Sequence, residues 1–282
     1  YDVAPVNGSV YTAMINTITS LSVGWQNISD LTGIEDFILL DTLDCAYNNL
    51  SSLDISQNTS LIFLSCYGNQ LTSLDVSNNT ALTELNCFGN QLTSLDVSQN
   101  TSLTFFDCVG NQLTSLDVSN NTALTDLYCY NNLLTTLDAS NNTALSSLAC
   151  ENNQLTSLDV SNNTALTDLY CYNNLLTTLD VSQNPALEGL YCSDNQLTSL
   201  DVRNGNNINF TFFRTTNNPN LYCIDVDDFQ YSLFNWNSSY FQFDTQHYFS
   251  NNCNPSAIEE HTTKKELLKV TDLLGRETKQ TN

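Results

Sequence analysis

The sequence predicts a solenoid, a stack of short coils that pack mainly on their neighbours, and three observations support this. Cysteines recur with a 21-residue period through more than half of the chain. Each of them is followed three places later by Asn and nine places later by Asp. Two segments that lie two periods apart, 120–138 and 162–180, are identical in every letter, which indicates recent duplication. Fixed periods of roughly 20–50 residues are typical of repeat architectures.

Each coil carries the same three markers. The cysteines are Cys45, Cys66, Cys87, Cys108, Cys129, Cys150, Cys171 and Cys192. The asparagines are Asn48, Asn69, Asn90, Asn111, Asn132, Asn153, Asn174 and Asn195. The aspartates are Asp54, Asp75, Asp96, Asp117, Asp138, Asp159, Asp180 and Asp201. The first half of the unit reads L-x-x-L-x-C-x-x-N-x-L, which matches the leucine-rich-repeat template with Cys in one Leu position.

The alternation within each unit assigns its side chains to two faces. Leu85 and Cys87 are expected to point inward, and Glu84, Asn86 and Phe88 outward. Coils stacked about 4.8 Å apart would form a parallel β-sheet on the concave face. The second half of the unit would form the convex side from extended segments or short 3₁₀ turns, because so short a coil leaves little room for a helix. The predicted fold is a leucine-rich-repeat solenoid with little helix, capped at both ends.

The Asn and Cys columns have structural explanations. A buried Asn side chain offers both donors and an acceptor to backbone groups that lose their partners where a coil turns. For the cysteines, packing as small hydrophobic side chains is favoured. Disulfides between neighbouring coils and a metal or redox ladder remain as alternatives, although stacked Cβ atoms would be too far apart for a typical bridge. The repeats contain no C-x-x-C and no His, which disfavours a metal site.

The phrase "LTELNCFGNQLTSLDVSNNTAL" resembles the 21-residue cysteine-containing leucine-rich repeats of bacterial surface proteins, of the internalin J-like type. In that family the cysteines form an unpaired ladder in the core, and the resemblance implies the same here. It covers eight repeats in residues 41–201. Residues 1–40 are interpreted as an N-terminal cap with an atypical first repeat, whose Trp25 covers the edge of the core.

Residues 202–257 are interpreted as a C-terminal cap, since the period fails after Asp201 and aromatic residues become frequent. The cap holds the two cysteines that are off the period, Cys223 and Cys253. We expect them to form a disulfide, which would suit an oxidising, extracytoplasmic setting. Two unpaired thiols are the alternative.

Residues 258–282 differ in composition from the rest and are interpreted as a linker and a truncated sorting segment. The phrase "LLKVTDLLGRE" resembles the opening of the type A C-terminal sorting domain of the type IX secretion system in Bacteroidetes. The resemblance implies a partner in the type IX secretion machinery and a location outside the cell or on its outer surface. The remaining strands of such a domain are absent, so the chain is expected to be truncated or cleaved.

Composition excludes several function classes. The net charge of −23 disfavours binding to nucleic acid or to anionic membrane surfaces. No apolar run approaches the roughly 20 residues that span a bilayer. The sequence contains no recognisable nucleophile–base set, phosphate loop or metal cluster, so we expect neither an enzyme nor a cofactor or metal site.

The outward positions of the predicted sheet are the candidate binding surface. Three positions per coil over eight coils give 24 places, of which nine are aromatic and none is Lys or Arg. Exposed aromatic side chains beside carboxylates suit sugar rings or a basic protein patch. The candidate ligand-binding residues on the concave face are Phe63, Tyr67, Glu84, Phe88, Phe105, Asp126, Tyr128, Tyr130, Glu151, Asp168, Tyr170, Tyr172 and Tyr191. Cross-strand stacking that only stabilises the sheet is the alternative.

The Asp column has a structural interpretation too, because Asp often accepts hydrogen bonds from amides and hydroxyls within turns. Weak condensation of cations along the column and specific Ca²⁺ sites are the alternatives. Taken together, the sequence predicts a secreted or cell-surface, adhesin-like binding protein that recognises protein or glycan. The alternative is a structural component of the surface or of a filament that self-associates and has no small ligand.

Overall fold

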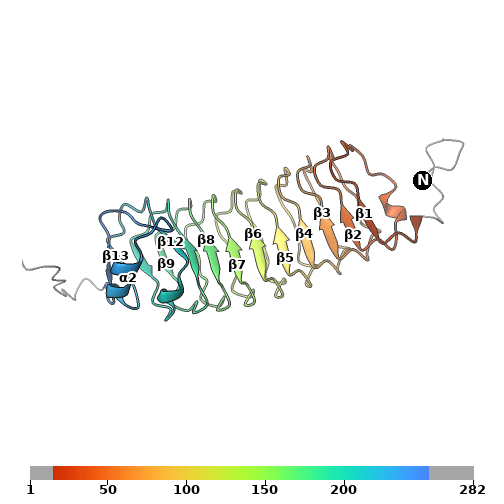
Figure 1. The fold of residues 1–282 in the computed structure, drawn as a ribbon. Coiled ribbons are helices and arrows are strands. Elements are labelled where there is room, and N and C mark those ends of the chain that lie inside the picture. The colour runs from red at the N-terminus through yellow and green to blue at the C-terminus, as the bar shows by residue number, and fades with distance from the viewer. Residues whose placement is uncertain (1–14, 254–282) are drawn as a thin grey trace, which may run out of the picture. The chain divides into compact units, whose positions relative to one another are not determined.

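The computed structural model describes residues 15–253, and residues 15–251 belong to one compact unit. Its main feature is an eleven-stranded, parallel sheet with strand order β1-β2-β3-β4-β5-β6-β7-β8-β10-β12-β14 (Figure 1). These strands are β1 (Ser20–Ser22), β2 (Thr42–Asp44), β3 (Phe63–Ser65), β4 (Glu84–Asn86), β5 (Phe105–Asp107), β6 (Asp126–Tyr128), β7 (Ser147–Ala149), β8 (Asp168–Tyr170), β10 (Gly189–Tyr191), β12 (Phe212–Arg214) and β14 (Phe241–Gln242). The predicted leucine-rich-repeat solenoid is confirmed.

The register of the sheet follows the repeat. Glu84 in β4 pairs with Phe105 in β5, and Phe105 pairs with Asp126 in β6. Hydrogen bonds continue beyond the three residues of each strand, since the Cys87 N–H donates to the Asp107 carbonyl at 2.8 Å. Equivalent residues of successive coils therefore lie side by side in columns.

The core lies between the sheet and the opposite wall. Leu85 and Cys87 are both fully buried, as predicted. The eight ladder cysteines are free and buried, which confirms the packing interpretation and makes the alternative of disulfides between coils wrong. Burial raises the pKa of Cys45 to about 12, so its thiol stays protonated at neutral pH.

The predicted Asn column satisfies backbone groups at the turn after each sheet strand. Asn90 accepts from the Leu71 N–H at 3.0 Å through Oδ1. Its Nδ2 donates to the Cys87 carbonyl at 3.0 Å and to the Cys66 carbonyl of the preceding coil at 3.1 Å. Each Asn of this column thus links two coils.

A second, equally regular Asn column lies under the opposite wall, and the sequence analysis assigned it no role. Asn79 is fully buried and donates to the carbonyls of Ile55 and Asn58, at 3.0 and 2.9 Å. Its neighbour Asn78 is exposed. The period distinguishes the two positions, because Asn recurs at every position equivalent to 79 from 58 to 184, whereas Gln stands at three of those equivalent to 78.

The opposite wall is mostly extended without regular strands. Leu74 and Val76 are buried and Asp75 is exposed, as the alternation predicts. Towards the C-terminal end this wall becomes a four-stranded sheet with order β15-β13-β11-β9. Its strands are β9 (Thr178–Asp180), β11 (Ser199–Asp201), β13 (Cys223–Asp225) and β15 (Tyr248–Ser250).

The ends of the stack differ from its middle. The first coil contains β1 and the 3₁₀ helix η1 (Ile34–Asp36). The side chain of Trp25 is 69% exposed, so the expectation that it covers the core edge is wrong. Beyond the eight periodic repeats, the chain continues through η2 (Asn207–Asn209), β12, α2 (Phe229–Asn235) and β14.

An aromatic cluster fills the C-terminal coils. Trp236 is 5% exposed and its ring contacts those of Phe210, Phe213 and Phe249 at 5.2–5.7 Å between centroids. Cys223 and Cys253, the two cysteines outside the ladder, are disulfide-bonded. Residues 1–14 of the expected N-terminal cap, the end of the expected C-terminal cap and the sorting segment 258–282 lie outside the described residues.

Candidate binding surface

The surface predicted as the concave face is the solvent side of the eleven-stranded sheet, called here the sheet face. Each strand between the first and the last of this sheet has a buried central residue, such as Leu85 in β4, so its first and last residues project to the solvent side. A third outward position follows two residues after the strand, as with Phe88. The sheet face therefore consists of three columns of side chains.

All thirteen candidate residues lie on the sheet face. Eight belong to strands: Phe63, Glu84, Phe105, Asp126, Tyr128, Asp168, Tyr170 and Tyr191. Five occupy the third column: Tyr67, Phe88, Tyr130, Glu151 and Tyr172. Glu84 is exposed, Glu151 is buried, and the others are partly exposed.

The centre of the sheet face is a pseudo-symmetric arrangement around β7. The duplicated coils place Tyr128 and Tyr170 on either side of Ala149, with which both are in register. In the first column, Asp126 and Asp168 flank Ser147 in the same way. Because Ser147 and Ala149 are small, the β7 coil presents little side chain between two coils that carry tyrosines.

The two aspartates beside this centre are oriented by neighbouring hydroxyls. The Thr125 hydroxyl donates to Asp126 at 2.8 Å, and the Thr167 hydroxyl donates to Asp168 at 2.8 Å. The Tyr128 hydroxyl also donates to Asp126 at 3.3 Å. Both carboxylates are thus held in place while remaining partly exposed.

Glu151 occupies the third column of the β7 coil and has different surroundings. Its side chain is 6% exposed, and its Oε2 atom has no hydrogen-bond partner. Burial raises the pKa of Glu151 to about 7. Burial also raises the pKa of Asp107, in β5, although its hydrogen bond from the Val109 N–H at 3.1 Å opposes the shift.

Many aromatic rings of the sheet face contact one another. Ring centroids of Tyr172 and Tyr191 lie 4.3 Å apart and those of Phe105 and Tyr128 5.5 Å apart. Tyr67 stacks on Phe88 at 6.3 Å. Cross-strand stacking therefore occurs, and it fixes the directions in which partly exposed rings face solvent.

Sequence reasoning missed four residues of this surface. Trp25 and Tyr47 extend the third-column stack at the N-terminal end, with centroids 3.8 Å apart. Both have left-handed backbones, with φ of 61° and 49°, where several later coils have Gly. Phe212 and Arg214 extend the face beyond the last periodic repeat in β12. The sequence F-F-R has the alternation of a sheet strand. It was overlooked because the preceding coil is two residues longer than the 21-residue period.

Phe212 and Arg214 make specific contacts with candidate residues. The Phe212 ring stacks on Tyr170 at 5.5 Å and leaves no room for a Cβ at Gly189. The Arg214 guanidinium lies over the Tyr191 ring, 5.5 Å from its centroid. The C-terminal end of the sheet face therefore carries a cation, unlike its eight periodic coils.

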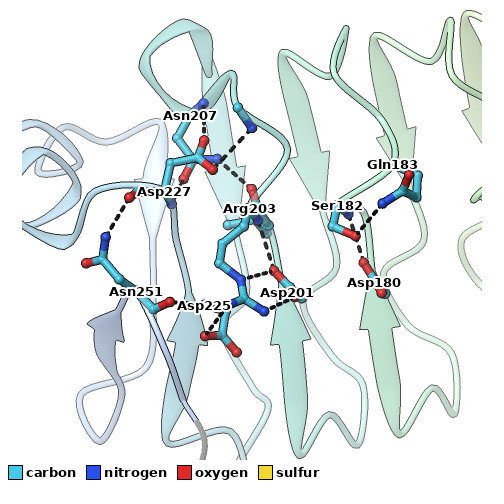
Figure 2. Close-up of polar contacts among 11 residues, drawn as sticks. Asp180, Ser182, Gln183, Asp201, Arg203, Asn207, Asp225, Asp227 and Asn251 are labelled. Carbon is cyan, nitrogen blue, oxygen red and sulfur yellow. Dashed lines mark hydrogen bonds and ion pairs between the residues drawn. The ribbon is translucent and has the colours of Figure 1, made fainter. Parts of the chain in front are cut away.

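The Asp column lies on the opposite wall, and its hydrogen bonds confirm the structural interpretation. Asp180 accepts from the Ser182 N–H at 2.8 Å, and the Ser182 hydroxyl in turn accepts from Gln183 at 3.3 Å (Figure 2). In coils such as that of Asp117, hydrogen bonds from the following Ser lower the pKa of the carboxyl.

At the C-terminal end of the Asp column, Arg203 lies beside the carboxylates (Figure 2). Its guanidinium makes an ion pair with Asp201 and lies 3.7 Å from Asp225. It also donates to the Asn251 carbonyl at 3.2 Å.

Among residues 15–253, no group of three or more His, Cys, Asp or Glu side chains is arranged to hold a metal ion. Within the same range no helix has the length and apolar character needed to cross a membrane.

Comparison with known proteins relates this geometry to a cysteine-ladder protein. The functional domain of InlJ from Listeria monocytogenes, which includes a cysteine ladder, superimposes with a TM-score of 0.71 at 42% identity. The match covers 77% of this chain and 51% of that domain. In sequence, 43 residues are 51% identical to Internalin J of L. monocytogenes serotype 4b (strain F2365). They amount to 15% of this chain and 5% of Internalin J.

A more distant likeness concerns the fold alone. A leucine-rich-repeat protein of Leptospira interrogans has a TM-score of 0.54 at 23% identity, over 68% of this chain and 62% of that one. No family model matches the sequence. The repeat, the parallel sheet and the buried ladder together identify the chain as a leucine-rich-repeat solenoid similar to the functional domain of InlJ.

Proposed function

We propose that the chain is the binding module of a secreted or cell-surface, adhesin-like protein, and that it recognises protein or glycan through the sheet face. The observation that carries the proposal is the central arrangement of Tyr128, Tyr130, Tyr170 and Tyr172 around β7. Their rings are partly exposed. Tyrosine offers a large contact area and a polar tip at a low cost in side-chain entropy, so such a cluster is suited to a ligand.

The rigidity of the scaffold supports this proposal. Tyr128 and Tyr170 lie in strands paired with β7. The carbonyls of Tyr130 and Tyr172 accept from N–H groups of the preceding coil, and the Asn column fixes the turn beneath them. Binding to a preorganised surface loses little conformational entropy. The likeness to the InlJ domain supports a surface or secreted location, and the resemblance of residues 258–282 to a sorting domain would supply the type IX secretion machinery as a further partner.

We also propose that Cys223 and Cys253 are bonded to each other, in keeping with an oxidising environment. Intact mass after alkylation of the unfolded, unreduced protein should show eight modified thiols, and reduction should add two. Ten modified thiols without reduction would contradict the bridge.

Binding of the purified chain to an array of glycans and extracellular proteins tests the main proposal. A variant with Tyr128, Tyr130, Tyr170 and Tyr172 changed to Ala should lose the specific signal. The matched control changes Tyr222 and Phe234 to Ala, since both are exposed, at 58% and 71%, but lie outside the sheet face.

The control should bind as the unaltered chain does. The proposal fails if the tyrosine variant keeps its signal, or if no ligand binds and light scattering shows oligomers or fibres instead. The second result would favour the structural, self-associating alternative.

A further inference from the structure

Glu151 is a buried carboxyl group with one unpartnered oxygen, and a backbone hydrogen bond only partly offsets its burial. Among residues 15–253 it is the only acidic side chain that has a buried oxygen without a hydrogen-bond partner. A buried carboxylate is costly unless it is paired, so such a group either takes up a proton or is completed by a ligand.

The groups that face Glu151 are neutral at physiological pH. Tyr130 and Tyr172 occupy the same column on the two adjacent coils, and Tyr170 also interacts with it electrostatically. Beneath the sheet face lie the ladder thiols of Cys129, Cys150 and Cys171. Burial raises the pKa of each of these thiols, which therefore remain protonated.

No cation of the described chain serves this carboxyl. The sheet-face positions of the eight periodic coils contain neither Lys nor Arg. Arg214 is in β12, and β10 and β8 separate it from the β7 coil. Its guanidinium lies over the ring of Tyr191. The site thus has a negative group and aromatic neighbours, and it lacks a positive one.

We propose that Glu151, Tyr130 and Tyr172 form the anchor site for a single Lys or Arg side chain carried by a protein partner. This inference rests on the proposed function of the sheet face, and it narrows the partner to a protein with an exposed basic segment. Tyr130 and Tyr172 are partly exposed, so the entering side chain displaces two rings at the surface rather than opening the core.

The chemistry favours an organic cation over the other ligands. The faces of Tyr rings attract Lys and Arg, and a guanidinium also donates to a carboxylate. A divalent metal needs several oxygen ligands, whereas Glu151 is a single carboxylate. A neutral sugar can donate hydroxyls, but it would leave the buried charge uncompensated.

Binding of the cation is coupled to loss of the Glu151 proton. With a carboxyl that titrates near 7, affinity should weaken roughly tenfold between pH 8 and pH 6. The tyrosines and buried thiols that face the site have raised pKa values, so they stay neutral across this range. Tyr130 also interacts with the carboxyl of Asp107, whose pKa burial raises, and the Glu151→Gln variant separates the titration of Glu151 from that of Asp107.

The first experiment is a carboxyl-carbon NMR titration of the glutamate-labelled chain, with butylguanidinium chloride or the same concentration of NaCl. Glu151→Gln assigns the signal. The guanidinium should lower the titration midpoint of Glu151 relative to NaCl and leave the signal of Glu188, which is exposed and outside the sheet face, unmoved. Equal midpoints in the two salts would overturn the proposal.

A second experiment uses a panel of short immobilised peptides with one Arg or Lys, beside the same peptides with citrulline or norleucine. The wild type should prefer the cationic members and bind them about tenfold more weakly at pH 6. Glu151→Gln should weaken this binding at least tenfold at pH 8 and remove its pH dependence. Glu188→Gln, at an exposed glutamate outside the three columns of the sheet face, should change neither.

The two proposals fail in different ways. If a ligand from the array binds through the tyrosines with equal affinity in Glu151→Gln, the anchor is wrong and the binding function stands. If the array gives no ligand but butylguanidinium still lowers the Glu151 midpoint, the cation site stands and the adhesin-like function fails. Preferential binding of neutral glycans, unaffected by pH, would also overturn the anchor.

Discussion

The sheet face and the opposite wall of the solenoid both carry acidic side chains, in different surroundings. Asp117 on the opposite wall is exposed and accepts from the Ser119 N–H at 2.9 Å, and hydrogen bonds from Ser119 lower its pKa. Glu151 on the sheet face is buried, and burial raises its pKa to about 7. The aspartates of the opposite wall accept hydrogen bonds within their own turns, whereas Glu151 on the sheet face keeps one carboxyl oxygen without a partner.

The two Asn columns also differ in how fully their side chains are hydrogen-bonded. Substitutions in them should have the largest effect on stability. Asn132, under the sheet, accepts from the Leu113 N–H at 3.0 Å and donates to the carbonyls of Cys108 and Cys129. Asn132→Ala should destabilise the fold by about 3 kcal/mol, because several buried backbone groups lose their partners. Urea denaturation followed by circular dichroism measures the change.

The matched variant under the opposite wall is Asn121→Ala. Asn121 donates to the carbonyls of Val97 and Asn100, but its Oδ1 atom is already without a partner. Its loss should therefore cost less, about 2 kcal/mol. A larger loss of stability in Asn121→Ala than in Asn132→Ala would contradict the conclusion that the column under the sheet contributes more.

The second prediction concerns the effect of pH on stability. Glu151 has a folded-state pKa of about 7, above the ordinary glutamate value of 4.5, so between these values the native state binds more protons than the unfolded state. Its contribution therefore destabilises the fold as pH rises from about 4.5 to 7. Glu151→Gln should make the chain more stable at pH 8 by about 1–3 kcal/mol, with little change at about pH 4.5.

Thermal melting at a series of pH values measures this difference. Glu84→Gln is the control, because Glu84 is an exposed carboxylate on the same face. A stability gain in the Glu151 variant that did not depend on pH would indicate a change in packing and would contradict the linkage.

The smallest effect is expected on the opposite wall, at the ion pairs of Arg203. The Arg203 side chain is 40% exposed, so Arg203→Ala should cost about 0–1 kcal/mol, and less in high salt. Urea denaturation at low and high NaCl concentration measures it. A loss of stability well beyond this range would show that Arg203, rather than the hydrogen bonds within the turns, stabilises the aspartates of this wall.

The repeat determined much of the fold before any coordinates were considered. The fixed period of Cys and Leu predicted the parallel register of Glu84 and Phe105, because a constant repeat length places equivalent residues in columns. The alternation around Leu85 assigned the outward residues correctly to one face. Where the period ended, prediction weakened, and Phe212 and Arg214 were missed although they continue the same sheet.

Other features could not be predicted, because the extent to which a side chain is buried does not follow from its position in the repeat. Glu84 and Glu151 are both outward residues of the same repeat, yet one is exposed and the other is 6% exposed. Tyr130 and Tyr172, which interact electrostatically with Glu151, lie one period away on either side.

The sequence by itself determined that this protein is a solenoid, how its coils align and which residues share a face, because these properties follow from periodicity. Only the tertiary structure decided which of those residues are buried and which polar groups are satisfied. These properties arise where three adjacent coils meet, and so they depend on neighbours that no single repeat contains. The unpartnered carboxyl oxygen of Glu151 is a property of this second kind.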